Sequence, residues 1–267
     1  MSRRRQSRGD TPANVALGSM LAYRIALISD IHGNELALRR VLEDIRQRGV
    51  DQIACLGDIA TLGPRPRETL ALLRESCDLF ILGNHDEYLF DPAAILDHSN
   101  SPQVRGAVEQ CRNQLSSEEV DFVRRFQRQI TVPLTNRSSL LLFHGSPDSN
   151  NCDLLAETPD AELAAHLDAR VATLMAGGHT HIQMLRQHRG RLLINPGSVG
   201  LAFERFVGGA PPTLMVHAEY AIVEARANDV SVTLHRVGLD RAALTDSVRG
   251  WDNPLRDYLA AQYGLER

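Results

Sequence analysis

Three short apolar runs alternate with two amphipathic segments over the first third of the chain. The runs RIALIS (24–29), QIACLG (52–57) and DLFILG (78–83) predict buried strands, because each is short, apolar and bounded by glycine or polar residues. The segments between them, 34–49 and 66–76, place apolar residues at helical spacing. Strand, helix, strand, helix, strand is the pattern of a parallel sheet with crossover helices. The chain is therefore expected to belong to the α/β class.

The rest of the chain alternates predicted helices and strands. Residues 86–135 predict a helical insertion of two helices packed over the sheet. Strand patterns return at 138–145 and 171–178, and the alternation at 218–237 predicts an antiparallel hairpin. Residues 239–267 predict closing helices. The predicted elements thus continue to the end of the chain.

Length and the N-terminal composition indicate the domain organisation. At 267 residues the chain fits one large domain with a sizeable core, and no repeat or low-complexity linker divides it. We expect a single domain over residues 23–267. Residues 1–22 are rich in arginine and lack the apolar stretch of a secretory signal. We expect a disordered tail there or, with Met20 as the true start, a start-site extension; an organelle transit peptide is the remaining alternative.

Charge and hydropathy argue against two classes of partner. The formal net charge is −4, which is unlike a protein that binds nucleic-acid duplexes. No apolar run approaches the roughly 20 residues that span a bilayer, so no membrane is expected. The 4 cysteines are far apart and form no C-x-x-C motif, which is typical of reduced thiols in a cytoplasmic protein. The sequence leaves open whether the chain forms a homo-oligomer.

Polar side chains stand directly after five of the apolar runs. In an open parallel sheet, ligands bind outside the carboxyl ends of the strands, so these side chains are expected to meet at one edge. They comprise two carboxylates, four imidazoles and one amide, with a further histidine beside them. In chain order the candidates are Asp30, His32, Asp58, Asn84, His85, His144, His179 and His181.

This donor set favours a pair of divalent cations. Imidazole nitrogens and carboxylate oxygens suit manganese, our first choice, and also iron, nickel, cobalt or zinc. We expect Asp30 with His32, and His179 with His181, to point to one side, since residues two apart on a strand share a face. Each piece alone has an ordinary explanation, such as a helix cap for Asp30. The ordered set has none in a protein core, so we interpret it as a metal site.

The other histidines have no partner motif. For these five we expect surface positions or satisfied core positions without a role in the site. They are His98, His166, His188, His217 and His235.

With these residues in place, the chain resembles the calcineurin-like metallophosphoesterase superfamily, and within it the small bacterial and archaeal phosphodiesterase branch. The resemblance covers about residues 23 to 237. It implies a four-layer α/β/β/α sandwich with a two-helix insertion over the active-site region, and a two-metal centre. The motifs that carry it are D-x-H (30–32), G-D (57–58), G-N-H-D (83–86), H-G-S (144–146) and G-H-T-H (178–181).

The resemblance also implies a role for each site residue. The implied ligands of one metal are Asp30, His32, Asp58 and His181. The implied ligands of the other are Asp58, Asn84, His144 and His179, with Asp58 as the bridge. His85 would be the general acid beside the leaving oxygen. Asp86 would orient His85 or, as an equal alternative, cap the helix that follows.

These roles imply a hydrolase of phosphodiester or phosphomonoester bonds in small substrates. Two metals would share a water, and the bridging hydroxide would attack phosphorus while His85 protonates the leaving alkoxide. Two alternatives stay open. One is a non-catalytic, metal-bound protein-interaction module of the same fold, and the other is a hydrolase of dinucleoside polyphosphates or protein phosphates.

One segment departs from the usual pattern of the superfamily. Residues 201–218 form a longer loop, with two glycines and two prolines, next to the predicted metal edge. We expect this loop and the 86–135 insertion to set the choice of substrate. Arg205 in the loop would contact a substrate phosphate or, alternatively, lie in solvent.

Overall fold

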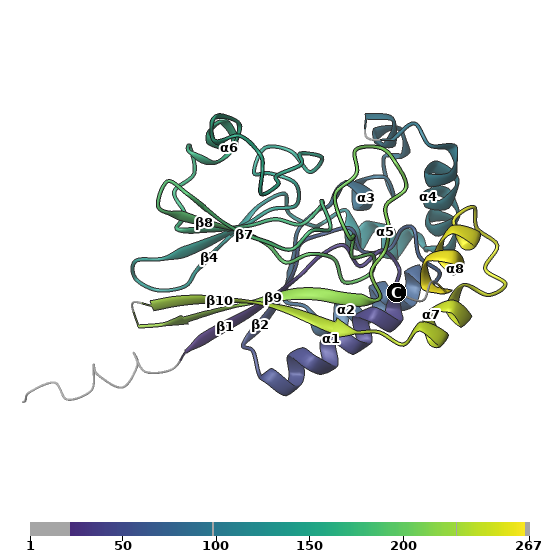
Figure 1. Cartoon of the computed structure of the whole chain (residues 1–267), viewed down its shortest axis with the longest axis horizontal. Helices are drawn as coiled ribbons and strands as arrows, with labels where there is room; N and C mark the ends of the chain where they lie inside the picture. The colour runs from purple at the N-terminus through teal and green to yellow at the C-terminus, as the bar shows by residue number, and fades with distance from the viewer. Residues whose placement is uncertain (1–21, 98, 228, 265–267) are drawn as a thin grey trace, which may run out of the picture.

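The computed structural model describes residues 22–97, 99–227 and 229–264, and these form two sheets with helices on their outer faces (Figure 1). The strand order of the first sheet is β10-β9-β1-β2-β3, and that of the second is β4-β5-β6-β8-β7. The strands of the first sheet are β1 (Tyr23–Ile28), β2 (Gln52–Cys55), β3 (Leu79–Phe80), β9 (His217–Arg226) and β10 (Asp229–Gly238). Those of the second are β4 (Ile130–Pro133), β5 (Ser139–Leu142), β6 (Leu174–Ala176), β7 (Met184–His188) and β8 (Arg191–Asn195).

The helices fall into three sets along the chain. The first set, α1 (Glu35–Arg48) and α2 (Pro66–Ser76), forms the crossovers of the first sheet. The second set follows β3 and precedes β4 in the chain. It comprises α3 (Asn84–Glu87), the 3-10 helix η1 (Pro92–Asp97), α4 (Pro102–Gln114) and α5 (Ser117–Val123). The last set is α6 (Asp160–Leu167), α7 (Arg241–Val248) and α8 (Arg256–Gly264).

The predicted parallel unit and the predicted hairpin are both confirmed. Strand β1 pairs with β2 in parallel, and β2 pairs with β3 in parallel. Strand β9 pairs antiparallel with β1 on one side and with β10 on the other, which places the C-terminal hairpin at the edge of the first sheet. The helix signals also hold for α1, where the Asn34 side chain accepts from the Ala37 N–H and Gly49 follows the last residue at a φ of 66°.

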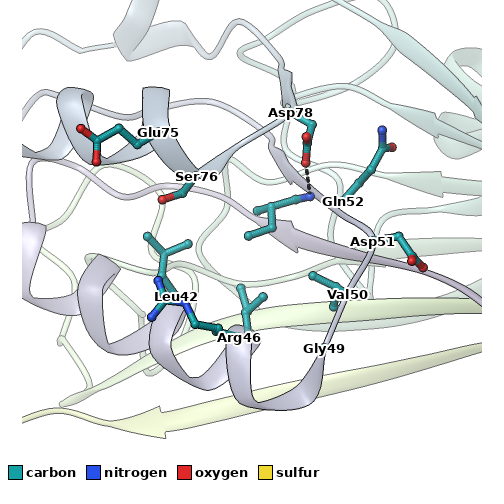
Figure 2. Close-up of a pocket in the computed structure, with 11 residues that line it drawn as sticks. Leu42, Arg46, Gly49, Val50, Asp51, Gln52, Glu75, Ser76 and Asp78 are labelled. Atoms are coloured by element: carbon teal, nitrogen blue, oxygen red, sulfur yellow. Dashed lines mark hydrogen bonds between the residues drawn. The ribbon is translucent and has the colours of Figure 1, made fainter.

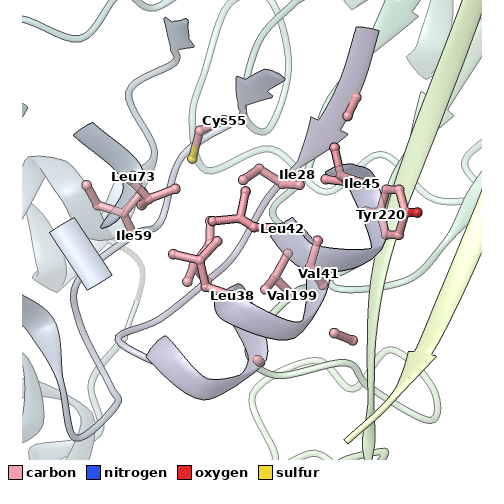
Figure 3. Packing of buried hydrophobic residues seen from close by; sticks show 14 of the residues in the cluster. Ile28, Leu38, Val41, Leu42, Ile45, Cys55, Ile59, Leu73, Val199 and Tyr220 are labelled. Atoms are coloured by element: carbon pink, nitrogen blue, oxygen red, sulfur yellow. The ribbon is translucent and has the colours of Figure 1, made fainter. Parts of the chain in front are cut away.

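Strand β1 shows why its apolar run is continuous. Ala26 and Ile28 point toward α1 and α2 and belong to the cluster in Figure 3. Ile25 and Leu27 point the other way, into a second cluster between the two sheets. Because both faces of the strand are buried, every position is apolar.

A third apolar cluster lies between the second sheet and α6, and contains Phe143, Leu163 and Met175. The three clusters lie between four consecutive layers. These layers are the helices α1 and α2, the first sheet, the second sheet and the helix α6. The predicted four-layer α/β/β/α sandwich is therefore confirmed, and so are the two helices, α4 and α5, within the 86–135 insertion.

Two boundaries differ from the prediction. Residues 130–133, at the end of the predicted helical insertion, form the edge strand β4, because they pair antiparallel with β5 and bury Val132 in the core between the sheets. The predicted strand at 78–83 is reduced to β3, with Ile81 in an isolated bridge to Gln127, and α3 begins at Asn84, directly after Gly83. Of the predicted tail at residues 1–22, residues 1–21 lie outside the described part of the chain. None of the helices described is both long and apolar enough to cross a membrane.

Candidate metal centre

The predicted ligands lie in loops beyond the strand ends, and most have a left-handed backbone. Neither predicted pair lies on a strand, since β1 ends at Ile28 and β6 ends at Ala176. Asp30 and His32 nevertheless meet in one ligand group, whereas His179 and His181 fall in different groups. Aspartate and histidine are among the non-glycine residues that adopt positive φ most readily, although the conformation costs about 1–3 kcal/mol. The φ values are 54° for Asp30, 48° for His32, 58° for Asp58, 70° for His179 and 59° for His181.

Hydrogen bonds between neighbouring loops hold this backbone in place. The Asp30 N–H donates to Gly57 O at 3.0 Å, and the His32 N–H donates to Asp58 O at 3.0 Å. The loops after β1 and β2 therefore continue side by side beyond the sheet. This pairing keeps the ligand side chains together at the carboxyl edge, as the sheet argument predicts.

Six of the seven predicted metal ligands fall into two groups whose ligand atoms lie within 4.8 Å of one another. The first group is Asp30, His32 and His181, and the second is Asp58, His144 and His179. Each group combines a loop of the first sheet with a loop of the second sheet. The centre therefore exists only where the two sheets meet.

The first group is compact and buried. His32 Nε2 lies 3.1 Å from His181 Nε2, and Asp30 Oδ1 lies 3.3 Å from His181 Nε2. Asp30 has no exposed surface, yet its Oδ1 has no hydrogen-bond partner among the described residues. A buried carboxylate oxygen without a donor is expensive unless a cation completes it. The residues present therefore fit a metal ion.

The second group includes the predicted amide ligand. Asn84 Oδ1 lies 3.0 Å from His144 Nε2 and 3.1 Å from His179 Nδ1. The Oδ2 of Asp58 lies 3.4 Å from His144 Nε2. Two imidazole nitrogens, a carboxylate oxygen and an amide oxygen thus converge on one point, a donor set that suits a borderline divalent cation.

Asp58 faces both groups. Its Oδ2 lies 3.7 Å from His32 Nε2 in the first group as well as 3.4 Å from His144 Nε2 in the second. Its other oxygen, Oδ1, accepts from the His85 N–H at 2.8 Å, which fixes the carboxylate. The two groups are therefore adjacent, with one carboxylate between them.

The electrostatics of the centre also suit a cation. Burial alone would raise the pKa of Asp30, but His181 lowers it to about 2. Burial would likewise raise the pKa of Asp58, but neighbouring histidines, His144 foremost, hold it well below its ordinary value. Burial and the neighbouring His181 lower the pKa of His32 to about 4. The site therefore holds two anions and a neutral imidazole with a free lone pair.

His144 shows the opposite shift. Burial alone would lower its pKa, but Asp58 raises it to about 10. Positive charge is thus favoured at the point where His144 meets Asp58. A divalent cation at that point would supply such charge, and ligand histidines must give up a proton to bind it.

Backbone carbonyls orient two of the ligand rings. His144 Nδ1 lies 2.7 Å from Leu56 O, and His181 Nδ1 lies 2.6 Å from Leu201 O. A carbonyl can only accept, so each Nδ1 carries a proton and each Nε2 faces the centre, where it could bind a cation once it is deprotonated. These carbonyls could not be identified from the sequence, because any residue supplies one.

The stretch Asn84–His85–Asp86 forms the start of the short helix α3. The Asp86 carboxylate accepts from the N–H groups of Gly83, Asp58 and Ile59 at 2.8–2.9 Å. Of the two predicted roles for Asp86, the cap is the one that these contacts support. Burial and the nearby Asp58 raise its pKa to about 7, against the effect of its backbone donors.

His85 has a partner that the sequence did not reveal. Its Nδ1 lies 2.9 Å from the Oγ1 of Thr61, which is fully buried. The His85 ring stands edge-on to His32, with centroids 5.0 Å apart. Thr61 lies three residues after Asp58 in a loop, and no motif marks it.

Five further residues named in the sequence analysis can be placed. Arg205 is exposed in the loop after β8. His188 lies 3.1 Å from Asp168, His217 lies 3.0 Å from Glu219, and both pairs are away from the ligand groups. His166 contacts Cys152 at 3.5 Å, His235 stacks on Tyr220, and His98 lies outside the described residues.

A cavity of about 340 Å³ lies at the opposite end of the first sheet (Figure 2). It is lined by the last turns of α1 and α2 and by the residues that begin β2 and β3, including Arg46, Asp51 and Asp78. None of the predicted site residues lines it. The cavity is therefore separate from the candidate metal ligands.

A buried Asp/His constellation at the loop edge of two packed sheets defines a metal-binding α/β sandwich. The chain belongs to the calcineurin-like phosphoesterase superfamily, whose domain model matches residues 23–224. This confirms the resemblance noted from the motifs. The match covers both ligand groups and ends within β9, so α7 and α8 lie beyond it.

Individual relatives agree with this assignment. The chain is similar to a metallophosphoesterase from Sphaerobacter thermophilus, with a TM-score of 0.70, 27% identity, and coverage of 90% of this chain and 98% of that one. A hypothetical protein from Pyrococcus horikoshii OT3 has a TM-score of 0.71 at 18% identity, over 90% of this chain and 96% of that one, and so shares the fold. An uncharacterized protein of Methanocaldococcus jannaschii is 29% identical over 184 residues, which is 68% of this chain and 72% of the relative.

Proposed function

We propose that the chain is a phosphoester hydrolase that acts on phosphodiester or phosphomonoester bonds with two divalent cations. The position of Asp58 supports this most, because one of its oxygens lies within 3.7 Å of His32 Nε2 and 3.4 Å of His144 Nε2. A carboxylate that faces two adjacent ligand groups suits a pair of cations about 3.5–4 Å apart.

The residues that would hold the cations are those of the two groups. Asp58 would serve both, and Asn84 would complete the second. When bound, such a pair activates a water as nucleophile and stabilises negative charge on the phosphoryl oxygens. The mixed nitrogen and oxygen donors keep manganese as the first choice, with iron, nickel, cobalt or zinc as alternatives.

His85 would donate the proton to the leaving oxygen. With Nδ1–H donating to the Thr61 hydroxyl, a protonated ring carries its second proton on Nε2, where it is available for transfer. The His85 N–H bond to Asp58 fixes the distance between the acid and the metal ligands. The adjacency of Asn84 and His85 would thus place a ligand and an acid in a constant relation.

Asp86 would act by positioning rather than by contact with substrate. Its carboxylate accepts from three backbone N–H groups, two of them in the loop of Asp58 and Ile59. It would thereby hold that loop and α3 in a fixed position relative to each other. Arg205 stays a proposed phosphate contact, because it is exposed two residues after Phe203, whose ring stacks on His181.

A substrate screen tests the proposed activity. The purified chain would be assayed with aryl phosphomonoesters, aryl phosphodiesters, cyclic nucleotides and dinucleoside polyphosphates, each with manganese, nickel and zinc. We expect hydrolysis that a chelator abolishes and added metal restores. A chain that hydrolyses none of them, but binds a protein in a fixed ratio, would instead be an interaction module.

A single domain over 23–267 and a cytoplasmic location stay predictions.

His85→Ala tests the acid directly. The variant should bind both cations as the wild type does, and turnover should fall by about 10²–10⁴-fold. His166→Ala, in α6 and in contact with Cys152, is the control and should keep full turnover. Unchanged turnover of His85→Ala at saturating manganese would overturn the role of His85.

A further inference from the structure

We infer that residues 198–203, which the C-terminal helices contact, hold two ligands of the first group, Asp30 and His181, and that Phe203 is the positioning residue of this support segment. The inference rests on the proposed function, because the ligands matter only if a cation binds them. The helices α7 and α8 follow the part of the chain that the superfamily model matches. In Figure 1 they lie together at the end of the molecule, next to α4.

The support segment contacts the loop of Asp30 directly. The Ser198 hydroxyl donates to Asp30 O at 2.7 Å, and the Gly200 N–H donates to the same oxygen at 3.0 Å. The approach is so close that a Cβ on Gly200 would overlap Ile31 O. The backbone that presents Asp30 is therefore fixed by this segment.

The same segment fixes His181 from two sides. Leu201 O lies 2.6 Å from His181 Nδ1, which sets the tautomer. The Phe203 ring stacks on His181, with centroids 4.2 Å apart and planes at 29°. The His32 ring is also next to His181, with ring centroids 4.9 Å apart. Phe203 thus covers one face of a ligand ring and limits its rotation.

Contacts with α8 hold the far side of the loop. Phe203 forms an isolated antiparallel bridge with Leu214. The Leu214 N–H donates to Gln262 Oε1 at 3.0 Å, and the Tyr258 hydroxyl donates to Pro212 O at 2.5 Å. Two side chains of α8 therefore anchor the strand-like segment that faces Phe203.

An apolar cluster completes the connection. Phe203 packs against it, and the cluster joins the loop to both C-terminal helices. Its buried members are Leu201, Leu214, Leu244, Val248, Leu259 and Tyr263. A continuous set of contacts thus runs from α7 and α8 through Phe203 to His181.

The ligand side chains of the second group have orienting partners outside the support segment, although the His179 N–H also donates to Asp30 Oδ2 at 3.1 Å. His144 is oriented by Leu56 O, and His179 lies 3.4 Å from Asp153. A change in the support segment should therefore weaken one cation site and spare the other. This selectivity separates positioning from a general loss of stability.

The test measures manganese affinity by calorimetry in two backgrounds. His144→Ala leaves the first group as the intact site, and His181→Ala leaves the second. Adding Phe203→Ala should lower affinity about 10–100-fold in the His144→Ala background and leave it unchanged in the His181→Ala background. Phe203→Tyr keeps the stacked ring and should restore the affinity.

A matched pair of variants tests the contact between α8 and the loop. Tyr258→Phe removes only the hydroxyl that reaches Pro212, and should lower affinity of the first group by roughly threefold, the equivalent of part of one hydrogen bond. Tyr220→Phe removes a hydroxyl that donates to Asp44 on α1 at 2.5 Å, and should change neither group. Circular dichroism checks that each variant folds. If Phe203→Ala does not fold, manganese affinity is compared in the two backgrounds with Phe203→Leu and Tyr258→Phe instead.

The outcomes distinguish this inference from the proposed function. If the wild type binds no cation, the proposed function fails and the inference falls with it. If the wild type binds two cations and Phe203→Ala binds both with unchanged affinity, only the inference is wrong. Equal losses in both backgrounds would also overturn it, because they would indicate general destabilisation.

Discussion

The Asp153 carboxylate lies 3.4 Å from Nε2 of the buried His179 ring, and the Asp153 side chain is itself 47% exposed. A proton on Nε2 next to this carboxylate leaves the Nδ1 lone pair on the side of Asn84 Oδ1, 3.1 Å away. Asp153 therefore selects the tautomer of His179 that can bind a cation in the second group.

Replacing this carboxylate should weaken the second group. Asp153→Ala is expected to lower cation affinity there about 10–100-fold, because the ligand ring loses its orienting partner. Titration calorimetry with manganese in the His181→Ala background measures it. Asp148→Ala is the control, since Asp148 on the same loop contacts Arg170 and no ligand. Equal affinities for the two variants would contradict the assignment.

The hydroxyl of Thr61 should matter for turnover and not for metal content. Thr61→Val removes the partner of His85 Nδ1, and we expect roughly tenfold slower turnover, the equivalent of one hydrogen bond of about 1.4 kcal/mol. The pH dependence of turnover should shift as well, since the acid loses a contact. Thr69→Val is the control, because the buried Thr69 hydroxyl has no hydrogen-bond partner among the described residues. A normal pH profile for Thr61→Val would count against a role through His85.

Gly83 should not tolerate a side chain. A Cβ there would lie 2.5 Å from the Asp58 backbone nitrogen and would also meet the Asp58 carboxylate. Gly83→Ala should therefore displace Asp58, lower the free energy of unfolding by about 1–3 kcal/mol and remove cation binding. Gly208→Ala is the control, since no atom lies within 4 Å of its added Cβ. Thermal unfolding and metal analysis of both variants check this, and a Gly83→Ala chain with full metal content would contradict it.

Asp44 should contribute stability that depends on pH. Burial alone would raise its pKa, but hydrogen bonds from Arg48 and Tyr220 outweigh this and lower it below the ordinary value of 3.8. A lowered carboxyl pKa stabilises the fold above the unfolded value and loses this effect as pH falls through the folded value.

Asp44→Asn should thus reduce the free energy of unfolding by about 1 kcal/mol at pH 7, and the difference should vanish near pH 2. Urea unfolding across this range measures it. Glu43→Gln, at the exposed neighbouring position, is the control. A constant difference at all pH values would show that charge is not the cause.

The alternation of apolar runs and helices was sufficient to predict the parallel α/β unit, because β1 is buried on both faces and its apolar run is continuous. The four layers were expected only from the resemblance to the superfamily. The edge strand β4 was missed for the converse reason. It is four residues long, and only Val132 is buried, so its pattern is too short to distinguish from a helix end. Pairing with β5, not local propensity, makes it a strand.

The ligands could be predicted because carboxylates and imidazoles after apolar runs are rare enough to notice. The geometry that unites them could not. Their positive φ values depend on hydrogen bonds between the loops of Asp30 and Gly57, and such contacts join residues that no motif links. Thr61, Asp153 and Phe203 were missed because each acts through a neighbour in space.

Each ligand group joins one sheet to the other, and His32 and His181, which meet in the first group, are 149 residues apart in the chain. Cations held by these groups would join the sheets at their loop edge by coordinate bonds in addition to apolar contact. The loaded molecule should consequently resist mechanical tension as one block, whereas a chelator would let the two sheets yield one after the other.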